Sequence, residues 1–365
     1  MKLLEPTQIG EYHLKNRMVM AAMTRSRATE DGVLRDITTT YYVQRANAGL
    51  ILTEATNISK DAIGSPFTPG LYTDRHIEAW KKVTHAVHEN GGVIFAQLWH
   101  TGRVGHSIDR SNKLPMAPSA IAIEGAQHFT SEGMKDYETP RAMNPEDIKQ
   151  TILDYRQAAL NAMAAGFDGV ELHAANGYLP QQFLSDSANQ RTDDYGGSIE
   201  NKSRFILDVM HELVDAVGGE KVGIKLSPLG TTNNIRFDNP IATYTYLIGE
   251  LNKMDLAFVE IARNTNKASM PPEYPREDDI ELFGKMSRNT VIANSGYNRE
   301  TAEAELVKGT ATLISFARLF LANPDLPTRF ERDANLNEAD SETMYGGDEK
   351  GYIDYPTLDA QTQDL

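Results

Sequence analysis

Three hydrogen-bonding side chains, His173, Asn176 and Tyr178, stand within six positions of one another and could do chemistry together. They follow an apolar run over residues 169–172, which is typical of a buried strand, so we expect them where that strand meets solvent. A histidine and an amide can hold a substrate oxygen, and a nearby phenol can deliver a proton. The spacing therefore indicates a catalytic site rather than packing.

Eight short apolar runs recur along the chain and are separated mostly by helical patterns. They span residues 18–22, 50–53, 93–98, 169–172, 222–226, 257–261, 290–293 and 312–316. The runs are continuous rather than alternating, which is typical of parallel strands buried on both faces. Eight is the strand number of an α/β barrel, and 365 residues suit one such barrel with insertions. We therefore expect an α/β fold, a (β/α)8 TIM barrel, with residues 1–365 forming a single domain.

The segments between the runs carry helix start signals, and two segments depart from the repeat. Asn144 and Pro145 offer an N-cap and a first-turn proline, and the segment Asn323-Pro324-Asp325 is expected to open the last helix. Residues 7–14 predict a small hairpin that plugs the bottom of the barrel. Residues 101–143 contain three prolines without a clear helix, follow the third strand, and predict a long loop that caps the mouth.

The composition excludes several classes of function. A net charge of −15 opposes attraction to nucleic acid or to anionic membranes, and no apolar run is long enough to span a bilayer. The chain has no cysteine, which rules out disulfides, thiolate metal sites and cysteine nucleophiles. His85 and His88 have the spacing of a metal pair but lack a third ligand, so a solvated helix face is expected there. We expect a cytoplasmic protein, monomer or homodimer, with a small-molecule substrate and no metal.

Polar residues follow the expected strands at the end where barrel enzymes keep their active sites. They are Thr24, Gln97, His100, His173, Lys225, Ser227, Ser295, Gly296 and Arg318. In a barrel these residues gather at one mouth. Ser295–Gly296 and Ala317–Arg318 follow the seventh and eighth strands, where loop amides and a helix N-terminus commonly hold a phosphate. The sequence therefore predicts an anionic ligand with its phosphate beside Arg318.

Motifs spread over nearly the whole chain resemble those of the old yellow enzymes, the FMN-dependent ene-reductases. They lie at residues 23–27, 41–46, 49–56, 97–103, 170–179, 189–197, 315–325 and 351–356. Their order and spacing together make the resemblance specific.

The resemblance implies non-covalent FMN as the cofactor, with NADPH or NADH as the reductant. The implied FMN-binding residues are Ala22, Met23, Thr24, Ala55, Gln97, Lys225, Ser295, Gly296, Ala317, Arg318, Met344 and Tyr345. Thr24 would bond the O4/N5 edge of the ring and Gln97 its pyrimidine end. Met344 and Tyr345 would close over the ring. No Gly-rich dinucleotide motif follows a strand, so the nicotinamide would share the open flavin face with the substrate, giving ping-pong kinetics.

The resemblance also assigns roles to the first three residues. His173 and Asn176 would hold a carbonyl, nitro or phenolate oxygen over the ring, polarising an activated alkene such as an enone or a maleimide. Hydride from reduced flavin N5 would reach the β-carbon, and Tyr178 would protonate the α-carbon. Two alternatives stay open: a flavin-binding protein with little turnover, and a cofactor-free barrel lyase that uses His173 and Tyr178.

Three positions depart from the family pattern. Lys225 stands where the family usually has an arginine against flavin N1/O2, which leaves a positive charge but no bidentate fork. Ser65 lies near a usual tyrosine of the substrate pocket, and Met344 replaces the usual phenylalanine. We therefore expect differences in flavin potential and in pocket shape.

Overall fold

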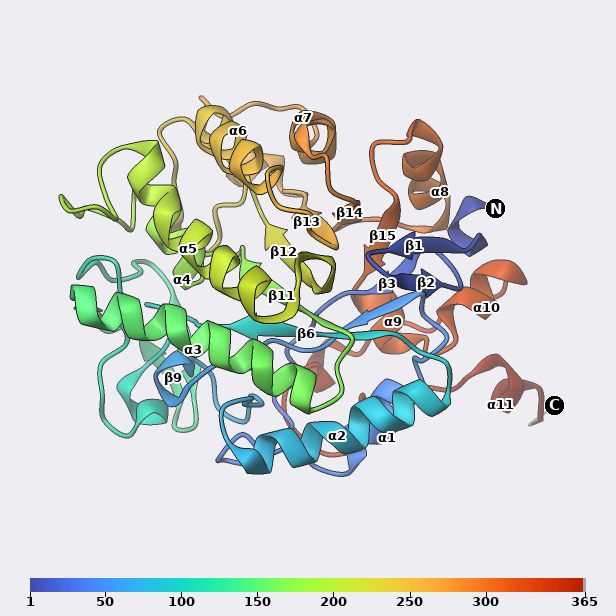
Figure 1. The fold of residues 1–365 in the computed structure, drawn as a ribbon. Helices are drawn as coiled ribbons and strands as arrows, with labels where there is room; N and C mark the ends of the chain where they lie inside the picture. Colours follow the sequence, from blue (N-terminus) through green and yellow to red (C-terminus); the bar gives the residue numbers. More distant parts are fainter. Residues whose placement is uncertain (364–365) are drawn as a thin grey trace.

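The structure is a computed structural model that describes residues 1–363, and it is built on a closed parallel β-barrel. The barrel strands are β3 (Met18–Met20), β4 (Leu50–Leu52), β6 (Ile94–Trp99), β11 (Gly169–Ala174), β12 (Val222–Leu226), β13 (Phe258–Ala262), β14 (Val291–Asn294) and β15 (Leu313–Phe316). They pair in that order, and the pairing of β15 with β3 closes the ring (Figure 1). Each strand overlaps one of the eight apolar runs, so the barrel prediction is confirmed.

Helices surround the barrel, and their bounds follow the expected start signals. They are α1 (Ile37–Val43), α2 (Asp74–Glu89), α3 (Pro145–Ala164), α4 (Leu179–Leu184), α5 (Ile199–Val217), α6 (Pro240–Leu251), α7 (Asp279–Phe283), α8 (Arg299–Lys308), α9 (Arg318–Ala322), α10 (Leu326–Glu331) and α11 (Leu358–Gln363). Asn144 caps α3 in a capping box with Asp147. The segment 323–325 opens a helix only through Asp325, the N-cap of α10, because Asn323 ends the short α9. This helix is not the last one, since α11 follows.

The strands alternate between outward residues that pack on the helices and inward residues that fill the barrel. The lower layer of the interior is apolar and includes Val19, Leu50, Leu52, Phe95, Phe258, Ile292 and Leu313. Ile9 and Leu14 join this layer from the N-terminal hairpin of β1 (Thr7–Ile9) and β2 (Tyr12–Leu14). The hairpin therefore plugs the bottom of the barrel, as expected.

The upper layer is polar, although it comes from the same strands. One inward position further along stand Gln97, Glu171, Lys225, Glu260, Asn294 and Ser315, all buried. The inward-facing residues therefore change from apolar to polar at one level of the barrel, and that level lies just below the mouth.

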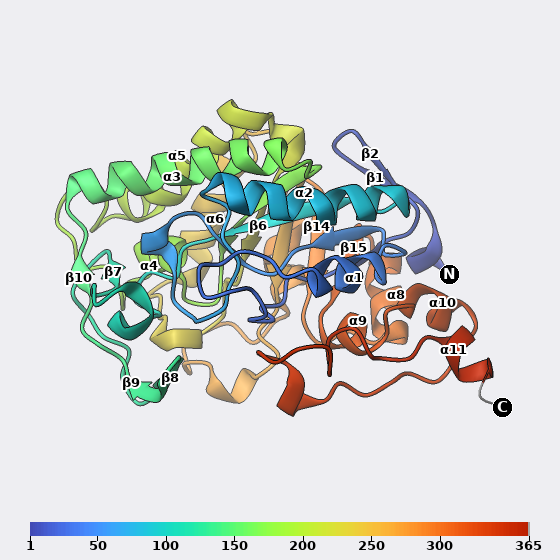
Figure 2. The ribbon, with the colours of Figure 1, turned by 90° about the horizontal axis from the view of Figure 1, so that it is seen from below.

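The segment after β6 is long and caps the mouth. It contains a 3-10 turn (Ser107–Arg110), the paired strands β7 (Met116–Ala117) and β10 (Arg141–Ala142), and an antiparallel hairpin of β8 (Gln127–Thr130) and β9 (Gly133–Asp136). A short strand β5 (Thr56–Asn57) pairs with the end of β6. Figure 2 shows the β8–β9 hairpin and the N-terminal hairpin at opposite ends of the molecule.

Candidate functional site

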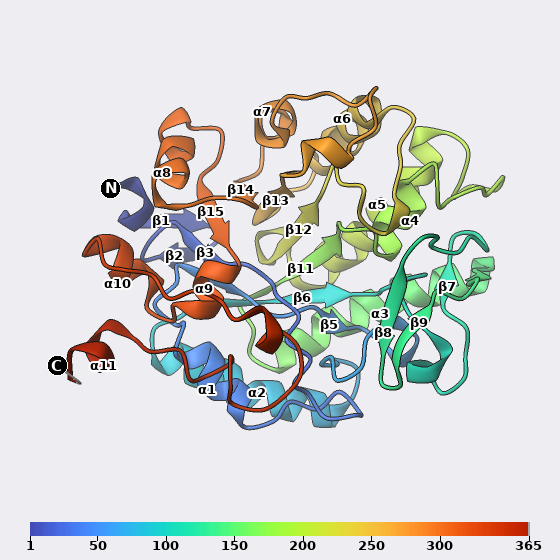
Figure 3. The ribbon, with the colours of Figure 1, turned by 180° about the vertical axis from the view of Figure 1, so that it is seen from behind.

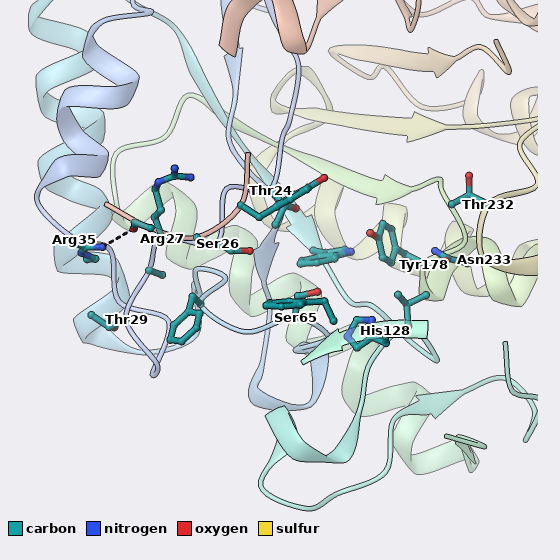
Figure 4. Close-up of a pocket in the computed structure, with 18 of the residues that line it drawn as sticks. Thr24, Ser26, Arg27, Thr29, Arg35, Ser65, His128, Tyr178, Thr232 and Asn233 are labelled. Carbon is teal, nitrogen blue, oxygen red and sulfur yellow. Dashed lines mark hydrogen bonds between the residues drawn. The ribbon is translucent and has the colours of Figure 1, made fainter. Parts of the chain in front are cut away.

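A cavity of about 890 Å³ opens at the mouth of the barrel. Its wall includes three residues expected in the site, Thr24, Tyr178 and Tyr345, and they come from three separate parts of the chain. Figure 4 shows Thr24 and Tyr178 in this wall. The wall is completed by Ser26, Arg27, Ala28, Thr29, Arg35, Ser65, Phe67, Trp99, Val104, His128, Phe129, Tyr137, Thr232, Asn233, Gly346 and Gly347. The departure at Ser65 therefore does bear on the shape of the pocket.

The turn after β11 brings His173 and Tyr178 together. β11 runs past the expected end to Ala174, so His173 lies inside the strand, and Asn176 (φ 54°) and Gly177 (φ 79°) turn the chain back. The rings of His173 and Tyr178 lie 4.8 Å apart, centroid to centroid, and Trp99 packs edge-on against Tyr178 at 5.0 Å. Trp99 thus both packs and lines the cavity.

The environment keeps His173 neutral and leaves one of its nitrogens free to donate. Burial, together with the charge of Lys225, holds the pKa of His173 well below its usual value. Its Nδ1 accepts the Ala175 N–H at 3.4 Å, so the ring proton sits on Nε2. Burial and the phenols Tyr137 and Tyr345 raise the pKa of Tyr178, whose hydroxyl stays protonated at neutral pH. Both groups can therefore act as donors.

Hydrogen bonds to its main-chain N–H and carbonyl fix the position of Asn176. Its N–H donates to Ser227 Oγ at 2.9 Å, and its carbonyl accepts the Asn233 amide at 2.9 Å. Among the described residues, the cavity wall includes neither Asn176 nor His173, although Asn233 and Tyr178 on either side belong to it. Both residues thus lie next to the cavity wall rather than on it.

The residues expected at the flavin ring form a donor set at the inner end of the site. Gln97 and Lys225 are buried at the upper layer of the barrel, Thr24 faces the cavity, and Ala55 is buried beside them in the chain after β4. Hydroxyl, amide and ammonium donors suit a ring edge that carries carbonyl and imide groups. The residues present therefore fit a flavin.

Two acids under this donor set were missed in the sequence. Gln97 Nε2 donates to Glu171 at 2.6 Å, and Lys225 Nζ lies 2.9 Å from Glu260 Oε2. The signal in the sequence was a single acidic residue inside each of two apolar runs, 169–172 and 257–261, at a position that faces inward. Such a residue is rarely buried without a partner.

The loop expected to hold the phosphate has an unusual backbone. Ser295 (φ 80°) and Gly296 (φ 75°) are both left-handed. Arg263 Nη2 donates to the Ser295 carbonyl at 2.8 Å, and its guanidinium stacks on Tyr297 at 3.8 Å. Arg318 is exposed at the start of α9, just after Ala317. With the Ser295 carbonyl engaged by Arg263, the amides and the Arg318 fork fit a phosphate.

Buried arginines hold the segment over residues 341–356, here called the C-terminal strap. Arg25 Nε donates to the Met344 carbonyl at 3.0 Å, and Arg27 Nη2 donates to the carbonyls of Thr343 and Lys350 at 2.9 and 3.0 Å. Tyr352 stacks on Tyr41 of α1, so the strap lies along that helix (Figure 3). Tyr345 is 67% exposed and borders the cavity.

The remaining expectations concern metals and membranes. His85 contacts Glu89 at 3.4 Å and His88 contacts Asp168 at 2.9 Å. Within residues 1–363 no three His, Asp or Glu side chains gather as a metal site requires. In the same part of the chain, no helix combines the length and apolar character needed to cross a bilayer.

Comparisons with known proteins agree over nearly the whole chain. The model of the NADH:flavin oxidoreductase / NADH oxidase family matches residues 2–337. The 12-oxophytodienoate reductase 1 of Oryza sativa subsp. japonica is 41% identical over 370 residues, covering 98% of this chain and 93% of the relative. Flavin oxidoreductase hxnT of Emericella nidulans is 40% identical, covering 97% of each chain.

Solved structures extend the likeness to three dimensions. The old yellow enzyme homologue of Zymomonas mobilis superposes with a TM-score of 0.94 at 40% identity, covering 98% of this chain and 100% of that one. Morphinone reductase in complex with tetrahydroNAD gives 0.92 at 44% identity, covering 99% of both. The chain therefore belongs to the NADH:flavin oxidoreductase / NADH oxidase family, the old yellow enzymes, and is an FMN-dependent oxidoreductase.

Proposed function

We propose that this enzyme reduces the C=C bond of activated alkenes, with His173 and Asn176 holding the substrate oxygen and Tyr178 supplying the proton. The observation that carries the proposal is the pair of neutral donors at the cavity: the Nε2–H of His173 and the hydroxyl of Tyr178, with ring centroids 4.8 Å apart. Similarity to proteins named as reductases of 12-oxophytodienoate and morphinone supports it.

The residues of the chain divide the work between holding the cofactor and handling the substrate. Thr24, Ala55, Gln97 and Lys225 would hold the FMN ring, and the turn at Ser295 with Arg318 would hold its phosphate. Ala22, Met23, Gly296, Ala317, Met344 and Tyr345 would complete the FMN site. When bound and reduced by NADPH or NADH, FMN supplies the hydride.

The substrate residues then act on the alkene. His173 and Asn176 would both donate to the substrate oxygen. These two neutral donors draw electron density away from the β-carbon and stabilise the negative charge that develops on that oxygen. Tyr178 donates its proton to the α-carbon, which its raised pKa permits because the phenol arrives protonated. The aromatic wall of Phe67, Trp99 and Phe129 excludes water and favours substrates with an apolar body.

Anaerobic half-reactions test the proposal. The FMN-loaded enzyme is bleached with NADPH or NADH, and 2-cyclohexenone is then added. We expect the yellow colour to return with formation of cyclohexanone. Bleaching without a return of the yellow colour would instead favour a flavin-binding protein with little turnover. Lys225 in place of the family's arginine is the reason to consider this alternative. A purified protein that takes up no FMN and still turns over a substrate would favour the cofactor-free lyase.

The wider setting of the enzyme is proposed on composition and packing. One apolar cluster reaches from Leu3 to Tyr352, which supports a single domain over residues 1–365. The absence of cysteine and the net charge of −15 support a cytoplasmic enzyme that acts on small molecules without nucleic acid or membrane. We propose a monomer or homodimer, which light scattering of the purified protein tests.

A further inference from the structure

Two acidic side chains are sealed inside the barrel directly beneath the site. Glu171 on β11 and Glu260 on β13 are both 0% exposed. They flank β12, whose Lys225 is opposite Glu260 in register. A buried charge without a partner costs several kcal/mol, so the contacts of these acids must explain why they are there.

The contacts tie each acid to a residue of the proposed FMN site. Glu171 Oε2 accepts Gln97 Nε2 at 2.6 Å, and Glu260 Oε2 lies 2.9 Å from Lys225 Nζ. Glu260 Oε1 also accepts the Ser315 hydroxyl at 2.5 Å. The two acids therefore lie behind both side chains expected at the pyrimidine end of the ring.

The same network continues to the phosphate loop. Ser315 Oγ accepts the Asn294 amide at 2.6 Å, and Asn294 Oδ1 accepts the Ser295 hydroxyl at 2.7 Å. The ion pair of Lys225 with Glu260 thus continues through hydrogen bonds of Ser315 and Asn294 to the half-buried Ser295.

Two carboxylate oxygens in this network, Glu171 Oε1 and Glu260 Oε2, are buried without a hydrogen-bond partner. Lys225 Nζ meets Glu260 Oε2 only as an ion pair. Burial first, and then the charge and direct contact of Glu260, raise the pKa of Glu171. Two carboxylates facing one lysine would leave an uncompensated negative charge in a sealed interior. One proton shared between the two acids removes that charge and gives the unpartnered oxygens a donor.

We propose that Glu171 and Glu260 share one proton, and that this carboxyl pair positions Gln97 and Lys225 and neutralises Lys225 beneath the flavin. The pair sets how much more tightly the site binds reduced than oxidised FMN. The statement about FMN affinity rests on the proposed function, because it requires the flavin to lie against Lys225. Both acids are positioning residues, since they act through Gln97 and Lys225.

Acid-to-amide substitutions test the shared proton, because an amide mimics a protonated carboxyl. In Glu171→Gln or Glu260→Gln one carboxylate remains to balance Lys225, so we expect the ratio of reduced to oxidised FMN affinity to change less than threefold. The double variant leaves Lys225 unbalanced and favours the more negative reduced form. We expect that ratio to rise at least tenfold, which is ~30 mV in the two-electron midpoint potential.

The measurements are FMN dissociation constants from fluorescence quenching and midpoint potentials from dye equilibration. Asp208→Asn is the matched control. Asp208 lies on the outer helix α5 and accepts a hydrogen bond from Tyr195, so this variant tests the loss of an acid outside the barrel, and we expect no change. Equal upward steps in the two single variants would show that both acids are ionised and would overturn the proposal. An unchanged potential in the double variant would overturn the neutralising role.

Infrared difference spectra test the proton without FMN, which separates this inference from the proposed function. Burial raises the pKa of Glu54 to about 7, so Glu54 contributes a protonated-carboxyl band of its own. Besides that band, we expect a second carbonyl band in glutamate-labelled wild type and its loss from each single variant. Persistence of the second band in both single variants would overturn the shared proton even if the double variant did not fold. Infrared agreement with unchanged potentials would support the shared proton and overturn only the neutralising role beneath the flavin.

Discussion

The lower and upper layers of the barrel interior lie one inward position apart on the barrel strands and are both buried, yet one is apolar and the other is polar and charged. Phe95, Phe258 and Leu313 below pack as hydrocarbon and are closed off by the N-terminal hairpin. Gln97, Glu260 and Ser315 above are equally buried but tied into hydrogen bonds and an ion pair. The lower layer contributes stability through burial, whereas the upper layer carries charges whose desolvation opposes folding. This difference supports the proposal that the upper layer serves the cofactor.

The largest effect that this comparison predicts is a loss of stability when the lower layer is altered. Phe258→Ala removes a fully buried ring, so we expect the free energy of unfolding to fall by about 3–5 kcal/mol. Denaturant titration measures this. FMN affinity and the rate of alkene reduction at 20 °C should stay within a factor of about three if the layers are independent. Loss of FMN binding in the folded variant would contradict that independence.

The upper end of the barrel should respond in the opposite way. Tyr178→Phe removes the proton donor while keeping the ring, so we expect reoxidation by 2-cyclohexenone to slow by about 100-fold or more. Bleaching by NADPH should be unaffected, and stability should change by less than about 1 kcal/mol. Stopped-flow kinetics of the two half-reactions separate these outcomes. An unchanged reoxidation rate would place the proton donor elsewhere.

Acid pH should also act on the upper end. Burial lowers the pKa of His100, at the end of β6, to about 3. Its folded pKa is below the unfolded value of about 6.5, so its contribution is fully present above pH 6.5 and is lost as pH falls toward 3. Between pH 6.5 and 5 this amounts to ~2 kcal/mol.

Substitution isolates that contribution. His100→Gln should flatten the decline in unfolding free energy over this range, as measured by urea titration at each pH. The matched variant His85→Gln, on the exposed face of α2, should keep the decline of the wild type. Equal slopes for all three proteins would contradict the assignment.

The smallest expected effect concerns the loop beside the upper layer. Arg263→Met removes the donors to the Ser295 carbonyl, so the amides of that turn lose their fixed direction. We expect FMN to bind about tenfold more weakly, or ~1.4 kcal/mol. Riboflavin, which lacks the phosphate, should bind as it does to the wild type. Equal weakening of both ligands would show that Arg263 supports the ring rather than the phosphate loop.

Much of the architecture could be predicted from the sequence because its signals are local. Continuous apolar runs marked all eight barrel strands, and Asn144 marked the start of α3. The β8–β9 hairpin was missed because its alternation is short and half exposed. Glu171 and Glu260 were missed because their burial depends on partners from other strands. Such partners are non-local, and spacing along the chain does not reveal them.

The C-terminal strap has a consequence for how the cavity can change. Arg25 and Arg27 grip it through main-chain carbonyls, so its attachment does not depend on which side chains it carries. Tyr345, at the cavity rim, can therefore be replaced without loss of these hydrogen bonds. Variation at that one position therefore offers a way to alter the cavity rim, and with it the proposed contact to the flavin, while the barrel stays undisturbed.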